Sequence, residues 1–574
     1  MASTLKEQVN GTDVPNWRKL ALQHRKDQLA KIPLEWQLET TSTPSSIDQK
    51  SAVPIIEAHL SAEELQITSL STTLPNIQSW IRDRKYTAVQ ITSAYCHRAA
   101  LLQQATGCLT EILFSSAIQT AKAQDEHFNT TGHLLGPLHG IPISIKDNQD
   151  IVGIDSTLGW VGLVGRPAKA SAPLVENLLQ AGAILYCKTN IPQSLMMSDS
   201  YNHLYGQSVN SLNRNLISGG SSGGEGALVA GGGSVTGIGT DIGGSVRIPA
   251  TLQGLYGLSP SIGRVGNRES TRRDKYVVPP VSGPLTRDIE SLDVFMSSYH
   301  STRPWLDDPA ILPIPWRQDI VDSYASLQIA TSSQSRTTKR LKIAYITNDS
   351  VIRPQPPVVR AVEHTISNFR QAGHECISWN DIASKHHATA YSLWLRAVLA
   401  DGGERFAALC QQCPGGGEPL IPGMLVGKPS DTLDNAGRQA LYDEIWSFQR
   451  TYMKLWRDQG IDALVMPVTQ WVGLRPKMWV EADMYVGYTS IWNLMNWTSL
   501  VVPSIKVDRK LDVLGDEWKA YQGVSKSDEY NHKHYEILLN DGELDDMPVG
   551  VQIVTGRLEE EKAVGIAKML ANLS

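Results

Sequence analysis

The sequence predicts an α/β fold, a large mixed, mostly parallel twisted sheet with helices on both faces. The first observation is that short β-branched runs alternate with stretches of helical periodicity, as in residues 173–188 and again in 342–373. The second is an ordinary globular composition, with 41% hydrophobic and 19% charged residues in 574. Alternating strands and helices bury one sheet between helical layers. The length allows roughly three or four domains, but large α/β enzymes also form one continuous body.

The N-terminal region differs from the rest of the chain. Residues 1–60 are polar and are interrupted by four prolines. We therefore expect residues 1–74 to form a helical arm packed on the body, anchored by Trp17 and Trp36. Residues 75–574 are expected to form the main domain.

The helices are expected where apolar residues recur every three to four positions. Thr87-x-x-Gln90 forms a capping box ahead of a helix whose apolar face includes Ile91 and Tyr95. Glycines at the ends of two other periodic stretches mark helix termini. The further expected helices cover residues 117–127, 173–182 and 357–372.

The strands are expected in short, apolar, β-branched runs. They lie within residues 136–148, 183–188, 342–345, 461–467, 500–503 and 547–553. Residues 301–341 are expected to form a surface connection, and the charged residues 506–546 an exposed excursion. Nine of the fifteen tryptophans fall between Trp379 and Trp518. Most of these should be core residues, and a minority should line a ligand pocket.

The strand within residues 136–148 carries Lys146 at its end. A lysine there can bend its ammonium group out to solvent, in which case it has no chemical role. If the side chain is enclosed, desolvation lowers its pKa and leaves a neutral amine that accepts protons. The second arrangement would make Lys146 a general base.

A glycine-rich stretch, residues 217–257, is the most unusual part of the sequence. Residues 219–257 hold 14 of the 46 glycines, two serine clusters and only three charged side chains. A flexible linker would not interleave so many apolar residues, and a membrane span would not contain so much glycine or these charges. The phosphate-binding patterns G-x-x-x-x-G-K-[ST] and G-x-G-x-x-G are absent. A catalytic loop pair is favoured, with backbone N–H groups facing an oxyanion and Ser221, Ser222 or Ser245 as nucleophile.

Composition limits the partners and the compartment. A net charge of −6 and an isoelectric point near 6.2 argue against nucleic acid or an anionic membrane as partner. Six cysteines are few for this length, and the first twenty residues lack an apolar signal core. We therefore expect a cytoplasmic protein with reduced thiols. Cys410-x-x-Cys413 has no second cysteine pair, so neither a metal nor a cofactor is expected.

Three motifs together resemble the amidase signature family. The serine-glycine signature is Gly219-Gly-Ser-Ser-Gly-Gly-Glu-Gly-Ala227, followed by Gly239-Thr-Asp-Ile-Gly-Gly-Ser-Val-Arg247. The lysine strand is His139-Gly-Ile-Pro-Ile-Ser-Ile-Lys-Asp147, and the closing strand is Pro548-Val-Gly-Val-Gln552. The resemblance covers roughly residues 75–570, and Ile32-Pro-Leu-Glu-Trp36 resembles fungal acetamidases of that family.

The resemblance implies a Ser-Ser-Lys triad. Ser245 would be the nucleophile, Ser221 a proton relay that follows a cis peptide bond from Gly220, and Lys146 the base. Backbone N–H groups from the loop around the nucleophile would bind the oxyanion; the candidates are Ile242, Gly243, Gly244 and Ser245.

Four other positions have less certain roles. Ser222 matches the second serine of the family motif and would support the first. Asp241 and Arg247 would either orient the loop by hydrogen bonds or form a structural ion pair. Leu195 lies where family members contact substrate, but an ordinary core leucine explains it equally well.

The implied activity is hydrolysis of the carbon–nitrogen bond of carboxylic amides to acid plus ammonia or amine, through an acyl-serine intermediate. The same triad could serve an esterase or carbamate hydrolase, and the family also includes a glutamine-dependent amidotransferase subunit. A Ser-His-Asp hydrolase using His139 or His203, and a binding protein that has lost catalysis, are two further alternatives. The expected partner is a small-molecule amide, with no nucleic acid and no membrane span; a homodimer is compatible with the sequence. The acyl preference cannot be read from these motifs.

Overall fold

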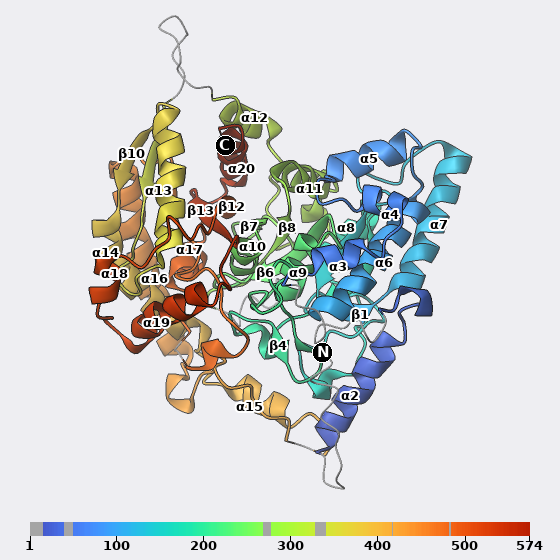
Figure 1. Cartoon of the computed structure of the whole chain (residues 1–574), viewed down its shortest axis with the longest axis horizontal. Helices are drawn as coiled ribbons and strands as arrows, with labels where there is room; N and C mark the ends of the chain where they lie inside the picture. The colour runs from blue at the N-terminus through green and yellow to red at the C-terminus, as the bar shows by residue number, and fades with distance from the viewer. Residues whose placement is uncertain are drawn as a thin grey trace, which may run out of the picture.

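An 11-stranded sheet crosses the molecule, in the order β1-β3-β2-β6-β8-β7-β12-β13-β11-β9-β10 (Figure 1). The computed structural model describes residues 15–38, 50–267, 277–327, 340–415, 417–481 and 484–573. The strands of the sheet are β1 Leu109–Ile112, β2 Pro142–Lys146, β3 Ile184–Thr189, β6 Thr236–Asp241, β7 Tyr256–Ser259, β8 Val281–Thr286, β9 Lys342–Tyr345, β10 Glu375–Ser378, β11 Ala463–Pro467, β12 Ser499–Lys506 and β13 Pro548–Val554. A separate small hairpin pairs β4 Tyr201–Asn202 with β5 Gly206–Gln207.

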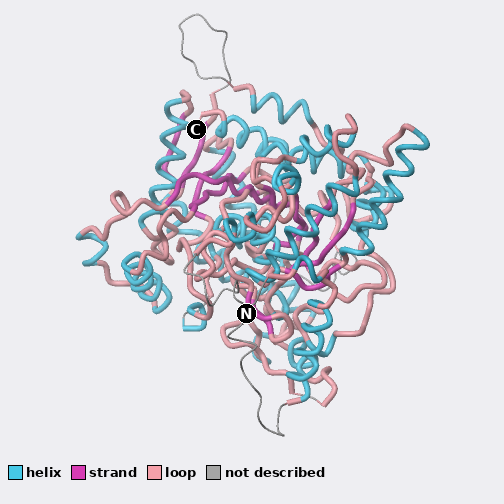
Figure 2. The backbone as a smooth tube through the Cα atoms, turned by 45° about the vertical axis from the view of Figure 1, so that its right-hand side comes forward, coloured by secondary structure: helices cyan, strands magenta, loops and turns pink. Residues whose placement is uncertain are grey.

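Parallel pairing is confined to two blocks of this mixed sheet. Strand β2 pairs in parallel with β3 and β6, and β9 pairs in parallel with β10 and β11. The strands that join these blocks pair antiparallel, from β6 through β8, β7, β12 and β13 to β11. The predicted large mixed sheet between helices is confirmed, with its parallel character concentrated in these blocks. The sheet is visibly twisted along its length (Figure 2).

Helices cover both faces of the sheet. In Figure 1 the N-terminal part of the chain lies on the right and the C-terminal part on the left. The α-helices are α2 Asn16–Leu29, α3 Val53–Glu57, α4 Ala62–Ile67, α5 Leu74–Arg82, α6 Ala88–Thr106, α7 Phe114–Thr131, α8 Pro173–Gln180, α9 Gly223–Ala230, α10 Arg247–Leu252, α11 Ile289–Ser301, α12 Gln318–Ala325, α13 Pro356–Gln371, α14 Asn380–Val398, α15 Glu404–Cys410, α16 Asn435–Asp458, α17 Gly487–Met495, α18 Asp516–Ala520, α19 Lys526–Asn540 and α20 Glu560–Ala571. Among the described residues, no helix has the length and apolar character needed to cross a membrane.

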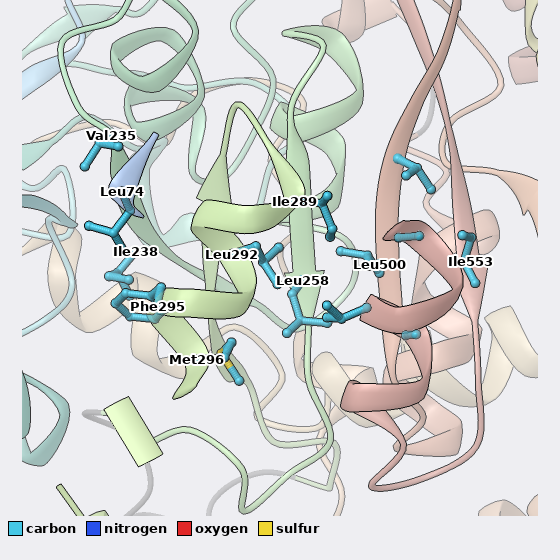
Figure 3. Packing of buried hydrophobic residues seen from close by; sticks show 14 of the residues in the cluster. Leu74, Val235, Ile238, Leu258, Ile289, Leu292, Phe295, Met296, Leu500 and Ile553 are labelled. Atoms are coloured by element: carbon cyan, nitrogen blue, oxygen red, sulfur yellow. The ribbon is translucent and has the colours of Figure 1, made fainter. Parts of the chain in front are cut away.

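One face of the sheet packs into the hydrophobic core, and the other face carries polar side chains. On the first, strand residues such as Leu258, Leu500 and Ile553 belong to the same core cluster as Leu292 and Phe295 of α11 (Figure 3). Successive side chains of a strand point to opposite faces of the sheet, so the apolar and the polar residues of β2 lie on different faces. Its isoleucines, at positions 143 and 145, join the same core. Its polar residues, at positions 144 and 146, face α9.

The N-terminal helix α2 contacts the body through aromatic residues. The Trp17 ring lies 4.9 Å from that of His203, and Trp36 stacks on His97 at 5.0 Å. Both expected anchor residues therefore contact the body. The division of the chain at residue 74 remains a prediction.

Two segments expected at the surface contain packed helices. Residues 506–546 include α19, in which Tyr535 and Leu538 are buried. Residues 301–341 include α12, which buries Val321 and packs against α20. Most side chains of both segments are exposed or half-buried, as expected for a surface location, but each segment also packs part of a helix against the body, which was not predicted. Residues 328–339, in the segment 301–341, lie outside the described residues.

Candidate active site

Lys146 ends β2 and is completely buried. Its Nζ lies 2.8 Å from Ser221 Oγ and 2.9 Å from Thr240 Oγ1. Strand β6, which carries Thr240, is the parallel neighbour of β2, so the pairing of the two strands sets this contact. In the described part of the chain, no carboxylate forms an ion pair with Lys146. The structure therefore decides between the two arrangements considered above in favour of the enclosed lysine.

The electrostatic environment of Lys146 favours the uncharged amine. Burial lowers its pKa from the ordinary 10.5 to about 7, against the opposing influence of Asp241, Glu225 and Asp147. A neutral amine has two N–H groups and one lone pair. Thr240 offers two acceptors to Nζ, its Oγ1 and, at 3.3 Å, its carbonyl oxygen. The lone pair is then free to accept the proton of Ser221.

The loop that precedes α9 presents Ser221 to Lys146. The peptide bond between Gly220 and Ser221 is cis, as the family resemblance implied. Ser222 joins this loop to its neighbours: its N–H donates to the Ser245 carbonyl at 3.1 Å, and its hydroxyl contacts Thr240 at 3.3 Å. Ser222 thus connects the loop of Ser221 to the loop of Ser245, and its supporting role in catalysis remains a prediction.

Ser245 follows β6 in the loop that leads into α10, and it is partly exposed. Ser221 and Ser245 both line a cavity of about 100 Å³. Leu195 contributes to the same wall and to a narrower cavity that also reaches Ser245. Leu195 has a positive φ of 70°. Leu195 also packs against the small apolar cluster that contains Leu158 and Phe406, and its contact with substrate remains a prediction.

The loop from Ile242 to Ser245 is fixed by its carbonyl groups. Trp394 Nε1 donates to the Ile242 carbonyl at 2.8 Å, and the Thr489 hydroxyl donates to the Gly243 carbonyl. The N–H of Gly244, however, donates to Asp241 Oδ1 at 2.8 Å. That N–H is occupied, so the expectation that Gly244 supplies an oxyanion donor is corrected. Ile242 and Gly243, which line the narrower cavity with Ser245, remain candidates.

A buried ion pair between Asp241 and Arg247 holds this loop in place. Arg247 donates to both carboxylate oxygens of Asp241, at 3.0 and 2.9 Å. Asp241 also accepts from the N–H of Val246 and from Asn493. Burial alone would raise the pKa of Asp241, but Arg247 and these hydrogen bonds together lower it. Asp241 and Arg247 were expected either to orient the loop or to form a structural ion pair. They do both, because the ion pair itself holds the loop.

Glu225, in the first turn of α9, was not among the predicted site residues. Ser144 Oγ donates to its Oε2 at 2.6 Å, and Thr189 Oγ1 donates to its Oε1 at 2.8 Å. The carboxyl group fits because residue 237 is glycine; a Cβ there would lie 2.0 Å from Oε2. Burial raises the pKa of Glu225 to about 8, which the two hydrogen bonds and Lys146 only partly oppose. Glu225 is therefore neutral at pH 7, which removes one of the negative charges that would otherwise raise the pKa of Lys146.

Replacing Glu225 with glutamine should stabilise the protein in a pH-dependent way. Above pH 4.5 the unfolded carboxyl group ionises, whereas the folded one stays protonated up to about pH 8. Stability is therefore lost as the pH rises between these values, and Glu225→Gln removes that loss. We expect a gain of about 1–3 kcal/mol in the free energy of unfolding at pH 7, and almost none at pH 4.5. Urea titrations at both pH values measure the difference; an equal effect at both would contradict a neutral Glu225.

Neither histidine of the alternative triad reaches the cavity. His139 precedes β2, at the opposite end of the strand from Lys146, and its Nδ1 accepts from the N–H of Leu135 at 3.1 Å. His203 packs on Trp17 of the N-terminal arm. No histidine is found among the described residues that line either cavity at Ser245. A Ser-His-Asp arrangement at Ser245 is therefore not supported.

An apolar wall extends from Ser245 into the C-terminal half, where the sequence offered no motif. The narrower cavity shares Met197, Ser198 and Met484 with a further cavity of about 40 Å³. Its remaining wall is largely aromatic and includes Trp471, Trp479, Tyr485 and Tyr530. Three of the nine clustered tryptophans line these cavities: Trp394 in the narrower one, and Trp471 and Trp479 in the one beyond it. The described residues contain no group of three or more His, Cys, Asp and Glu side chains that could hold a metal ion.

Comparisons with known proteins agree with this geometry. The family model described as Amidase matches residues 90–564. An acetamidase of Emericella nidulans is 33% identical over 572 residues, which cover 97% of this chain and 98% of that protein. An acetamidase of Aspergillus oryzae is 32% identical, with 97% of this chain and 99% of the relative covered. The solved structure of a fatty acid amide hydrolase has 27% sequence identity and a TM-score of 0.86, covering 97% of this chain and 95% of that one.

Proposed function

The chain belongs to the amidase family and hydrolyses the carbon–nitrogen bond of linear amides, and we propose that Lys146, Ser221 and Ser245 are its catalytic triad. The observation that carries the proposal is the 2.8 Å contact between a fully buried Lys146 Nζ and Ser221 Oγ. Ser245 shares the cavity wall with Ser221. The three residues supply a base, a relay and an exposed nucleophile.

Acylation begins with proton removal, because a serine hydroxyl is a weak nucleophile. Neutral Lys146 takes the proton of Ser221 as Ser221 takes that of Ser245. The Ser245 oxygen then attacks the amide carbonyl carbon. The proton returns along the same relay to the nitrogen, the carbon–nitrogen bond breaks, and ammonia or an amine leaves. The product of this half-reaction is an acyl group on Ser245.

The negative charge of the tetrahedral intermediate requires fixed hydrogen-bond donors. The N–H groups of Ile242, Gly243 and Ser245 fill this role, because the anchored carbonyls of the loop keep its peptides from reorienting. Water then attacks the acyl group and gives its proton to Lys146 through Ser221. The acid leaves and the Ser245 hydroxyl is restored.

The substrate is a small-molecule amide. The cavity at the triad has apolar lining residues, which include Leu158, Leu195, Met196 and Phe406, and a polar part that includes Asp401 and Arg405. The apolar part fits the hydrocarbon portion of an acyl group. The acetamidases that resemble this chain over nearly its full length support a linear amide and a stand-alone enzyme. We place the reaction in the cytoplasm, without a nucleic-acid partner; a homodimer is compatible with this arrangement. Esters and carbamates could react at the same triad, since an alkoxide leaves more easily than an amine.

Covalent labelling tests the assignment of the nucleophile. A fluorophosphonate should form one stable adduct, and peptide mapping should locate it on Ser245. Ser245→Ala should abolish both the adduct and amide hydrolysis, whereas Ser222→Ala should keep the adduct. An adduct on Ser221 or Ser222 in the parent protein, or continued labelling of Ser245→Ala, would refute the assignment.

A further inference from the structure

Asp199 lies between the loop that carries Ser221 and the aromatic cavity wall, and it is completely buried. It belongs to neither cavity lining, and its carboxylate does not contact the triad. Asp199 nevertheless contacts both the Ser221 loop and the aromatic cavity wall, which come from distant parts of the sequence.

The carboxylate of Asp199 accepts three hydrogen bonds. The N–H of Ser200 and Gln207 Nε2 donate to Oδ1 at 2.7 and 2.8 Å, and Trp479 Nε1 donates to Oδ2 at 2.7 Å. All three partners are donors, so a protonated carboxyl group would find no acceptor among them for its own O–H, and the ionised form fits the site better. Burial raises the pKa of Asp199 to about 6, against these hydrogen bonds, and the group is therefore ionised at pH 7 and above.

The backbone around Asp199 fits closely against the loop of Ser221. A Cβ placed at Gly220 would lie 2.4 Å from the Asp199 carbonyl oxygen and 2.6 Å from its nitrogen. The hydroxyl of Ser200 donates to the Gly219 carbonyl and accepts from the Gly223 N–H, both at 3.0 Å. The turn at Asp199 and Ser200 thus contacts the loop on both sides of Ser221.

The same turn also forms the cavity wall. Met197 and Ser198, which directly precede Asp199, line the narrower cavity at Ser245 and the aromatic cavity beyond it. Trp479, the third hydrogen-bond partner, lines the aromatic cavity. A shift of the carboxylate would therefore be transmitted to the serine loop and to the wall together.

We propose that Asp199 is a positioning residue that fixes the Ser221 loop and the indole of Trp479 relative to each other, and so determines both turnover and the selection of longer acyl groups. This inference rests on the proposed triad. The reasoning is that catalytic groups must be held within a fraction of an ångström, and that a misplacement of about 1 Å costs about 100-fold in rate. Asp199 holds Trp479 of the wall through its carboxylate and packs against the Ser221 loop through its backbone.

The test compares two primary amides, acetamide and hexanamide, which share ammonia as leaving group. Asp199→Asn offers one acceptor oxygen to three donors, and we expect kcat to fall at least about tenfold on both amides. Labelling of Ser245 by diisopropyl fluorophosphate should slow by a similar factor. Trp479→Phe removes only the indole donor, and we expect the loss in kcat/KM to be at least about fivefold greater for hexanamide than for acetamide, through KM. A residue that merely stabilises the fold would not separate the two substrates in this way.

Matched variants at the surface serve as controls. Asp83→Asn, whose side chain is 66% exposed, and Trp446→Phe, 59% exposed, should leave both amides and the labelling rate unchanged. If Asp199→Asn retains kcat within about twofold on both amides, or if Trp479→Phe leaves the ratio of the two substrates unaltered, the inference is wrong. Should Asp199→Asn not fold, Gln207→Met, which removes another donor, decides the question by the same fall in kcat. A parent protein that is not labelled on Ser245 would instead refute the triad.

Discussion

Lys146→Ala is expected to slow acylation by about 10³–10⁴-fold at pH 7, because the variant has no base to accept the proton of Ser221. General base catalysis contributes about 10²–10⁴-fold, and here the same group also returns the proton to the leaving nitrogen. The loss should be smaller at pH 10, where hydroxide can remove the serine proton. Single-turnover release of p-nitroaniline from an acyl p-nitroanilide measures this step directly.

Two further variants show whether that loss is specific. Ser221→Ala should impair acylation while keeping the fold, since it interrupts the relay but leaves Lys146 in place. Lys122→Ala, at an exposed position of α7, should behave as the parent. A Lys146→Ala protein that acylates at the parent rate would exclude the lysine from the mechanism.

Asp241→Asn is expected to lower the free energy of unfolding by about 3–5 kcal/mol, because it leaves Arg247 buried without a counter-charge. Both side chains are completely buried, and Asp241 also accepts from the N–H groups of Gly244 and Val246. The substitution should therefore also disorder the loop that holds Ser245 and reduce kcat. Urea denaturation and steady-state kinetics on the same preparation measure the two effects.

A double-mutant cycle isolates the charge pair from other losses. In Asp241→Asn combined with Arg247→Met, the unpaired charge is gone, and we expect the double variant to be less destabilised than the sum of the single ones by about 1–3 kcal/mol. Strictly additive effects would mean that the pair does not act as a unit.

The elements of the fold with strong local patterns could be predicted from the sequence. Strand β2 was recognisable as a short, apolar, β-branched run, and α6 because Thr87 and Gln90 form the expected capping box. Helices α12 and α19 were missed because few of their residues are buried, so their apolar positions form only a weak pattern in the sequence. Their burial depends on neighbours that are remote in sequence, such as α20 beneath α12.

The site residues divide in the same way into those that lie in local motifs and those that depend on contacts with remote parts of the chain. Lys146, Ser221 and Ser245 lie in motifs. The contact between Lys146 and Thr240 follows from adjacent parallel strands, whereas Ser221 reaches Lys146 from the loop before α9. Trp479 could not be found in this way, because its partner is about 280 positions away. The occupied N–H of Gly244 was equally hidden, since only the folded loop shows that Asp241 accepts from it.

The pH dependence of acylation tests most directly whether Lys146 acts as an uncharged base. Its pKa is lowered to about 7, so the neutral fraction increases as the pH rises through that value. The single-turnover rate should therefore rise about tenfold per pH unit below 6 and level off above 8. A rate that stays constant between pH 5 and 9, or that falls as the pH rises through 7, would contradict a neutral lysine as the base.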